Sequence, residues 1–251
     1  MSNRDFPVQA VLLDAGNTLI RVRGSVGEVY AAVARRHGLR ADGAALDRAF
    51  RQVFQERRPG FLTGVSRPHS PERERAWWQG LVREVLRRCG LDGMPPRRFA
   101  AFFDDLYQTF ARPEPWEVFP DALECLDALA ARGIPVAVVS NWDSRLRDVL
   151  EGLGLAGRFR FVLVSAEFGA EKPDPSIFLE AVRRMGVRPD RVVHAGDLYR
   201  EDVLGARAAG LRAVLVDREG TAPFARNRVQ DLTGLLGLLA TWEPGGGGER
   251  P

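Results

Sequence analysis

Short apolar runs alternate with amphipathic stretches over most of the chain. The first run, Val8 to Leu13, is almost continuously apolar, which is typical of a strand buried on both faces of a parallel sheet. Later runs predict strands at 134–139, 161–164, 192–195 and 213–216. Helical patterns occupy 121–131, 144–153, 175–185, 202–209 and 230–240. This alternation predicts an α/β fold with a doubly wound, parallel five-stranded sheet.

A helical region separates the first of these strands from the second. Four helical patterns run from about Val26 to Arg112, divided by turns rich in Gly and Pro. Helices with apolar stripes and short connections predict a small four-helix bundle. We therefore expect a core made of residues 1–20 and 115–243, an inserted helical domain at 21–114, and a loose glycine-rich tail at 244–251.

Polar side chains follow each of the first four predicted strands at its carboxyl end. In chain order they are Asp14, Ser140 with Asn141, Lys172, and Asp197 with Asp202. The carboxyl ends of parallel strands meet at one edge of a sheet, so these groups are expected to converge. Hydroxyl and lysine donors beside several carboxylates are the parts that a phosphoryl-transfer site with Mg²⁺ requires.

Composition narrows the candidate functions. The chain of 251 residues has a net charge of +3, with acids and bases interspersed, so we expect no nucleic-acid partner. It has no apolar run long enough to span a membrane and no signal-peptide pattern, and its two cysteines are widely spaced. We therefore expect a cytoplasmic protein without a membrane partner. The sequence leaves its oligomeric state open.

Lysine use adds one sharper observation. Lysine and arginine together number 36, and Lys172 is the single lysine. A lone lysine among many arginines favours a place that needs a compact point charge, although chance is a competing explanation.

Four segments together resemble the motifs of the haloacid dehalogenase superfamily. They are LLDAGNTL at 12–19, VAVVSNWD at 136–143, EKPDPSIF at 171–178 and GDLYRED at 196–202. Their order and spacing match the family along the chain, and the helical insert lies where the family's C1-type cap lies. The resemblance implies a Rossmann-like core with a cap that closes over the site and selects the substrate.

The resemblance also implies catalytic roles. Asp14 would attack phosphorus and form an aspartyl-phosphate, while Ser140 and Lys172 would hold the phosphate oxygens of a small, anionic, phosphorylated substrate. Asn141 follows Ser140 and is a candidate for the same substrate-binding role, with a turn role as the alternative.

A metal site is implied as well. Mg²⁺ would be held by Asp14, by Asp197 and by the backbone carbonyl of Gly16, and Asp202 would support the metal's waters or Lys172.

Gly16 departs from the phosphatases of this family, which carry a second Asp there as general acid and base. Asn17 does not replace it, because an amide is not a proton-donating acid. The leading hypothesis is a Mg²⁺-dependent phosphatase with weakened turnover. One alternative is a catalytically silent binding protein. Another is a metal-independent 2-haloacid dehalogenase, a class that lacks the Gly-Asp pair seen here at Asp197. A phosphonatase would need a second lysine, which the chain does not have.

Overall fold

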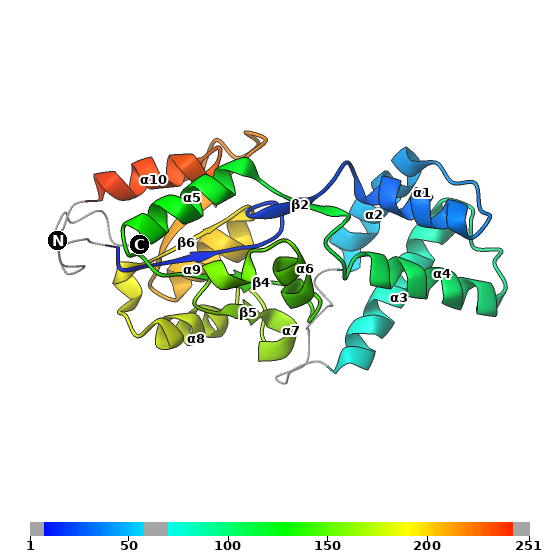
Figure 1. Ribbon diagram of the computed structural model, residues 1–251, viewed down its shortest axis with the longest axis horizontal. Coiled ribbons are helices and arrows are strands. Elements are labelled where there is room, and N and C mark those ends of the chain that lie inside the picture. Colours follow the sequence, from blue (N-terminus) through cyan, green and yellow to red (C-terminus); the bar gives the residue numbers. More distant parts are fainter. Residues whose placement is uncertain (1–7, 58–69, 243–251) are drawn as a thin grey trace.

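A parallel sheet flanked by helices forms the larger part of the molecule (Figure 1). The structure is a computed structural model that describes residues 8–57 and 70–242. The sheet has six strands in the order β5-β4-β1-β6-β7-β8. Their bounds are β1 Ala10–Leu13, β4 Val136–Ser140, β5 Val162–Val164, β6 Val192–Gly196, β7 Arg212–Val216 and β8 Arg228–Val229. This confirms the predicted α/β class and its parallel sheet.

Strand β1 lies inside the sheet, between β4 and β6, and both of its faces are covered. Val11 and Leu13 belong to the apolar core shared with α5, α6 and α10, whereas Ala10 and Leu12 belong to the core shared with α8 and α9. All four residues are fully buried, which explains why the run carries no polar alternation. The helices are α5 Pro120–Ala131, α6 Leu146–Gly152, α7 Ser165–Phe168, α8 Pro175–Met185, α9 Gly205–Ala208 and α10 Leu232–Thr241.

Four helices form a separate unit beside the sheet, on the right of Figure 1. They are α1 Val26–Arg36, α2 Gly43–Arg57, α3 Pro71–Arg88 and α4 Pro96–Thr109, and they share an apolar core of their own. Ser25 begins α1 with a capping box, in which its hydroxyl accepts from the Glu28 N–H and the Glu28 carboxylate accepts from the Ser25 N–H.

Two short strands join this helical unit to the sheet. Strands β2 Ile20–Val22 and β3 Trp116–Val118 pair antiparallel, so the chain leaves and re-enters the core at one place. The sequence predicted neither of these strands. A three-residue strand is too short for a period-two pattern to reveal it.

The core also differs from expectation in two details. The sheet has a sixth strand, because Arg228–Val229 pairs in parallel with β7. The helix expected at 202–209 begins earlier, as a π-helical segment at Tyr199–Leu204, and becomes α-helical only in α9.

The residues of the expected tail, 244–251, lie outside the described part of the chain. Among residues 8–57 and 70–242, no helix is long and apolar enough to cross a membrane.

Candidate active site

Asp14 lies at the carboxyl end of β1, between the ends of two neighbouring strands. Leu13 pairs with Val138 of β4 and with Ala195 of β6, and the Asp14 N–H donates to the Ala195 carbonyl over 2.9 Å. Its side chain is nearly buried, with 6 % of the residue exposed. The register of the sheet thus places the carboxylate beside the groups that follow both neighbours.

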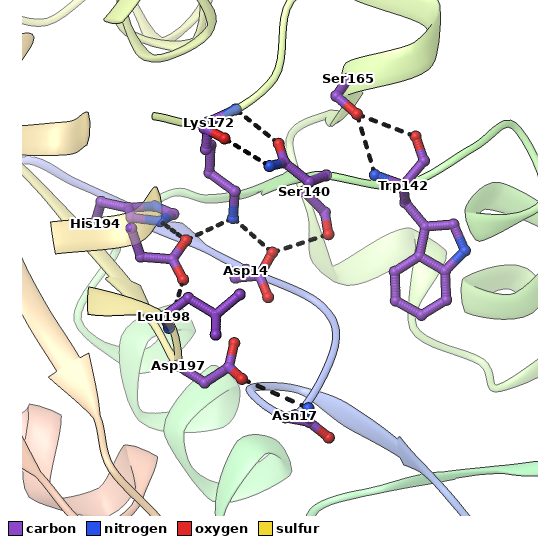
Figure 2. Close-up of polar contacts among 11 residues, drawn as sticks. Asp14, Asn17, Ser140, Trp142, Ser165, Lys172, His194, Asp197 and Leu198 are labelled. Carbon is purple, nitrogen blue, oxygen red and sulfur yellow. Dashed lines mark hydrogen bonds and ion pairs between the residues drawn. The ribbon is translucent and has the colours of Figure 1, made fainter. Parts of the chain in front are cut away.

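Two donors reach one oxygen of that carboxylate. Ser140 Oγ donates to Asp14 Oδ1 over 2.8 Å, and Lys172 Nζ donates to the same atom over 2.6 Å (Figure 2). Neither donor bonds to Oδ2. Three residues that were predicted to converge from separate segments are therefore in direct contact.

Lys172 is held in its charged form. Burial opposes the charge of its ammonium, but the Asp14 and Asp202 carboxylates outweigh burial and raise the pKa of Lys172 above its ordinary value. Its backbone is fixed by Asn141, whose side-chain amide donates to the Lys172 carbonyl over 2.8 Å and whose side-chain oxygen accepts from the Lys172 N–H over 2.7 Å. In this arrangement Asn141 orients the lysine.

Asp202 is fully buried and bonded on both oxygens. Its Oδ1 accepts from Lys172 Nζ over 2.5 Å and bonds to His194 Nε2 over 2.9 Å, while its Oδ2 accepts from the Leu198 N–H over 2.9 Å. Burial acts to raise the pKa of Asp202, but Lys172 and His194 outweigh it and hold that pKa below the ordinary range. Gly196 makes the approach feasible, since a Cβ there would lie 2.2 Å from the Asp202 Cγ.

The histidine in this contact favours its neutral form. Burial lowers the pKa of His194 against the opposing influence of the Asp202 carboxylate. The structure identifies Asp202 as its partner, a contact that the sequence did not reveal. Lys172 and His194 together occupy one Asp202 oxygen, so Asp202 positions the lysine.

Asp197 has the opposite environment. Its carboxylate accepts from the Asn17 amide at 3.5 Å, and Figure 2 shows it near Asp14 on the side away from Ser140. Burial, followed by the Asp14 and Asp202 carboxylates, raises the pKa of Asp197 well above its ordinary value. A cation bound between these carboxylates would relieve their mutual repulsion.

The donor set fits a hard divalent cation. Asp14, Asp197 and Asp202 each offer a carboxylate oxygen, and these atoms lie within 4.8 Å of one another. Oxygen donors alone, with more negative charge than Lys172 neutralises, suit Mg²⁺. The bonds that already occupy Asp202 make Asp14 and Asp197 the better candidates for direct ligands.

Gly16 lies against an aromatic ring. A Cβ added at Gly16 would approach the Trp142 Cζ3 atom to 3.2 Å, and the indole in turn packs on Trp116 with ring centroids 5.1 Å apart. The Trp142 backbone is held by Ser165, whose hydroxyl accepts from the Trp142 N–H and donates to the Trp142 carbonyl, both over 3.2 Å (Figure 2). The ring therefore occupies the space where a side chain at position 16 would begin.

The same ring lines a cavity between the helical unit and the sheet. The cavity measures about 90 Å³, and its walls are mainly aromatic and aliphatic, including Tyr30, Trp116 and Phe110. Trp142 connects it to the loop that follows Asp14, because the ring also lies beside Gly16, a position that the sequence did not reveal. The only signal was an aromatic residue two positions after Ser140.

A buried ion pair closes one wall of this cavity. Arg145 donates to Asp143 through Nε and Nη2, over 2.9 and 2.6 Å, and its guanidinium lies over the rings of Tyr107 and Trp78. Trp78 Nε1 also donates to Asp143, and Arg145 Nη1 donates to the Tyr107 carbonyl. The sequence did not reveal this cluster, because Trp78 in α3 and Tyr107 in α4 are distant in the chain from Asp143 and Arg145.

Comparisons with known proteins agree with this geometry. Residues 8–210 match the model of a hydrolase family described as haloacid dehalogenase-like hydrolase. The haloacid dehalogenase-like hydrolase domain-containing protein 3 of Danio rerio is 38 % identical over 213 residues, which cover 85 % of this chain and 86 % of that protein. A phosphoserine phosphatase of Thermus thermophilus is 38 % identical over 146 residues, 57 % of each chain.

Solved structures share the fold. The crystal structure of a defluorinating L-2-haloacid dehalogenase superposes with a TM-score of 0.74 at 24 % identity, covering 93 % of this chain and 95 % of the other. The resemblance noted in the motifs is confirmed.

Proposed function

Because the chain belongs to the haloacid dehalogenase-like hydrolase family, we propose that it is a phosphatase that hydrolyses a small phosphate ester through Asp14 with the help of Mg²⁺. The observation that carries this proposal is the contact of Ser140 Oγ and Lys172 Nζ with one Asp14 oxygen. A carboxylate nucleophile beside a hydroxyl and an ammonium suits attack on phosphorus, because both donors can bond to the phosphate oxygens as charge develops. A phosphatase among the relatives supports the same reading.

Each residue has a task in the reaction that we propose. Asp14 attacks phosphorus and forms an aspartyl-phosphate, from which water later releases phosphate. Ser140 and Lys172 bind the phosphate oxygens and orient the group for attack. Asn141 and Asp202 hold Lys172 in place, the first through its backbone and the second through its ammonium.

Mg²⁺ fits the carboxylate side of the cluster. In our proposal Asp14, Asp197 and the Gly16 carbonyl hold it, and Asp202 supports this arrangement through Lys172. When bound, the ion supplies charge neutralisation at the phosphate and the nucleophile.

We further propose that the unit formed by α1–α4 acts as a cap that selects the substrate. The cavity beside Trp142 lies between this unit and the sheet, so residues of both contact whatever enters. The expected substrate is a small phosphorylated molecule.

Gly16 motivates one other candidate, a protein that binds a phosphorylated ligand but turns it over little or not at all. General acid–base catalysis contributes roughly 10²–10⁴-fold, and no carboxylate stands at position 16 to provide it. The dehalogenase alternative has less support, because the Asp197 carboxylate beside Asp14 favours a cation site that this class does not use.

A substrate panel tests the proposal. Release of phosphate from small phosphate esters would be measured with Mg²⁺ and with EDTA, for wild type and Asp14→Asn, beside halide release from 2-chloropropionate. Metal-dependent phosphate release that Asp14→Asn abolishes is expected. Binding of phosphate without turnover of any ester would identify the silent protein, and halide release in EDTA would identify the dehalogenase.

A further inference from the structure

The acids near Gly16 already have tasks in the function proposed above: Asp14 is the nucleophile, and Asp197, which accepts from the Asn17 amide, is a carboxylate ligand of Mg²⁺. Protonation of a leaving oxygen would therefore fall to the immediate neighbours of Gly16. Among the described residues, the side chains beside Gly16 are the Asn17 amide and the Trp142 ring, and neither is an acid. Since the ring already lies 3.2 Å from where a Cβ would stand, the position cannot gain a side chain without moving Trp142.

The adjoining cavity does not supply an acid either. Of its described lining residues, those that titrate are Tyr30, Tyr107 and Arg145. Burial raises the pKa of both tyrosine hydroxyls, and Arg145 is paired with Asp143. All three therefore stay protonated and are weak proton donors at neutral pH.

The remaining wall is apolar and belongs to the cap and the linker strands. Trp78, Tyr107 and Trp116 present ring surfaces, and Arg145 adds no free charge because Asp143 neutralises it. A cavity of about 90 Å³ exceeds the ~10–15 Å³ that one water needs, so it has room for a small apolar group.

We infer that the substrate is a phosphate compound whose leaving oxygen departs as a stable anion, an aryl or acyl phosphate with a small apolar body seated against Trp142. This inference rests on the phosphatase activity proposed above. Without an acid at position 16, the barrier for an alkoxide leaving group is not lowered, whereas a phenolate or carboxylate needs no proton in order to leave.

The proposed steps balance without a protein acid. An Asp14 oxygen forms a bond to phosphorus while the bond from phosphorus to the leaving oxygen breaks, and the electron pair departs on a phenolate or carboxylate anion. Water then attacks the phosphorus of the aspartyl-phosphate, the bond to the Asp14 oxygen breaks, and the proton of water passes to the phosphate released. The second step also lacks a base, so the phosphoenzyme is expected to accumulate.

A series of esters tests the inference with wild-type protein in Mg²⁺. The probes are 4-nitrophenyl, phenyl and benzyl phosphate, which are similar in size and apolarity but release alcohols of decreasing acidity. The expected kcat/KM for benzyl phosphate is at least about 10²-fold below that for 4-nitrophenyl phosphate, the minimum contribution of the missing acid. A smaller difference would overturn the inference. If neither 4-nitrophenyl phosphate nor acetyl phosphate were hydrolysed, the proposed function itself would fail.

A charged substrate tests whether the body of the ester is seated in the apolar cavity. The KM for 4-carboxyphenyl phosphate is expected to be at least tenfold above that for phenyl phosphate, since its carboxylate would enter a wall without free positive charge. Equal KM values would remove the apolar cavity from the proposal.

A matched pair of variants isolates the acid. Gly16→Asp with Trp142→Gly makes room for a carboxyl group, and Gly16→Ala with Trp142→Gly makes the same room without one. We compare kcat/KM for 4-nitrophenyl phosphate divided by kcat/KM for benzyl phosphate. This ratio should be at least tenfold lower in the double variant that carries Gly16→Asp than in the one that carries Gly16→Ala. An equal ratio in the two folded variants would contradict the inference, and the wild-type series decides the matter if either variant fails to fold.

Discussion

Asp197 and Asp202 are chemically identical side chains with opposite expected effects on stability. Asp202 is bonded to Lys172, His194 and the Leu198 N–H, whereas Asp197 has neighbouring carboxylates and one amide contact at 3.5 Å. Asparagine has nearly the shape of aspartate and removes only the charge and one acceptor. The two single substitutions, made in metal-free protein, therefore compare the two environments directly.

The expected magnitudes follow from these contacts. In Asp202→Asn the new NH₂ group replaces an oxygen that accepted a hydrogen bond, so it must face a donor, either the Lys172 ammonium or the Leu198 N–H. Lys172 also loses one of its two carboxylate partners. Breaking a buried ion pair on one side costs about 3–5 kcal/mol of unfolding free energy. For Asp197, two unit charges at most 4.8 Å apart interact by at least about 3 kcal/mol at an effective dielectric constant of about 20. Two carboxylates repel Asp197 and one ammonium attracts it, so Asp197→Asn should stabilise the protein, by about 1 kcal/mol after relaxation.

Urea unfolding at neutral pH in EDTA, followed by circular dichroism, measures both changes through the denaturation midpoint and slope. If Mg²⁺ binds as proposed, added Mg²⁺ should stabilise the wild type by mass action and should stabilise Asp197→Asn less. A loss of stability in Asp197→Asn as large as that in Asp202→Asn would refute the reasoning, because it would mean that the Asp197 carboxylate is satisfied by the protein without a cation.

Three further substitutions test the core, the cap and the contact between them. Burial raises the pKa of the Cys125 thiol to about 12, so the native state keeps a proton that the unfolded chain releases near pH 9. The stability that this proton gives is present below about pH 9 and is lost as pH rises towards about 12. The unfolding free energy should therefore fall less between these pH values in Cys125→Ala than in the wild type, and parallel curves of unfolding free energy against pH would contradict this. Phe102 is fully buried in the unit formed by α1–α4, and Phe102→Ala should cost about 3–5 kcal/mol in urea unfolding, against less than 1 kcal/mol if the core of that unit repacks freely. Arg145→Met leaves Asp143 buried without its cation and should cost about 3–5 kcal/mol by the same measurement, a loss that replacement of Asp143 by Asn in the same chain should partly restore.

Much of the candidate site was predictable because a parallel sheet converts sequence order into spatial proximity. An apolar run such as Val8 to Leu13 predicts a central strand, and the residue that follows must then lie at the carboxyl edge with those that follow its neighbours. The contacts of Asp14 with Ser140 and Lys172 confirm this. No such rule applies to side chains that meet across the two units, and for this reason the sequence did not reveal the bond from Trp78 to Asp143. The Trp142 ring lies beside Gly16 within the core, but strand order does not determine which way a side chain two residues beyond a strand end points.

The single lysine shows where composition carries more information than pattern. Lys172 lies between two carboxylate oxygens at 2.6 and 2.5 Å and is 3 % exposed. An ammonium has three donors, so two bonds to Asp14 and Asp202 leave one, which the proposed function assigns to a phosphate oxygen. A planar guanidinium has five donors in a fixed fork, and burial there would leave several of them without acceptors. Arg145 shows the arrangement that suits a guanidinium, because Asp143 meets its fork with both carboxylate oxygens. The two separate acceptors around Lys172 suit the compact charge of an ammonium better than a planar fork, which gives the single lysine of this chain a physical reason.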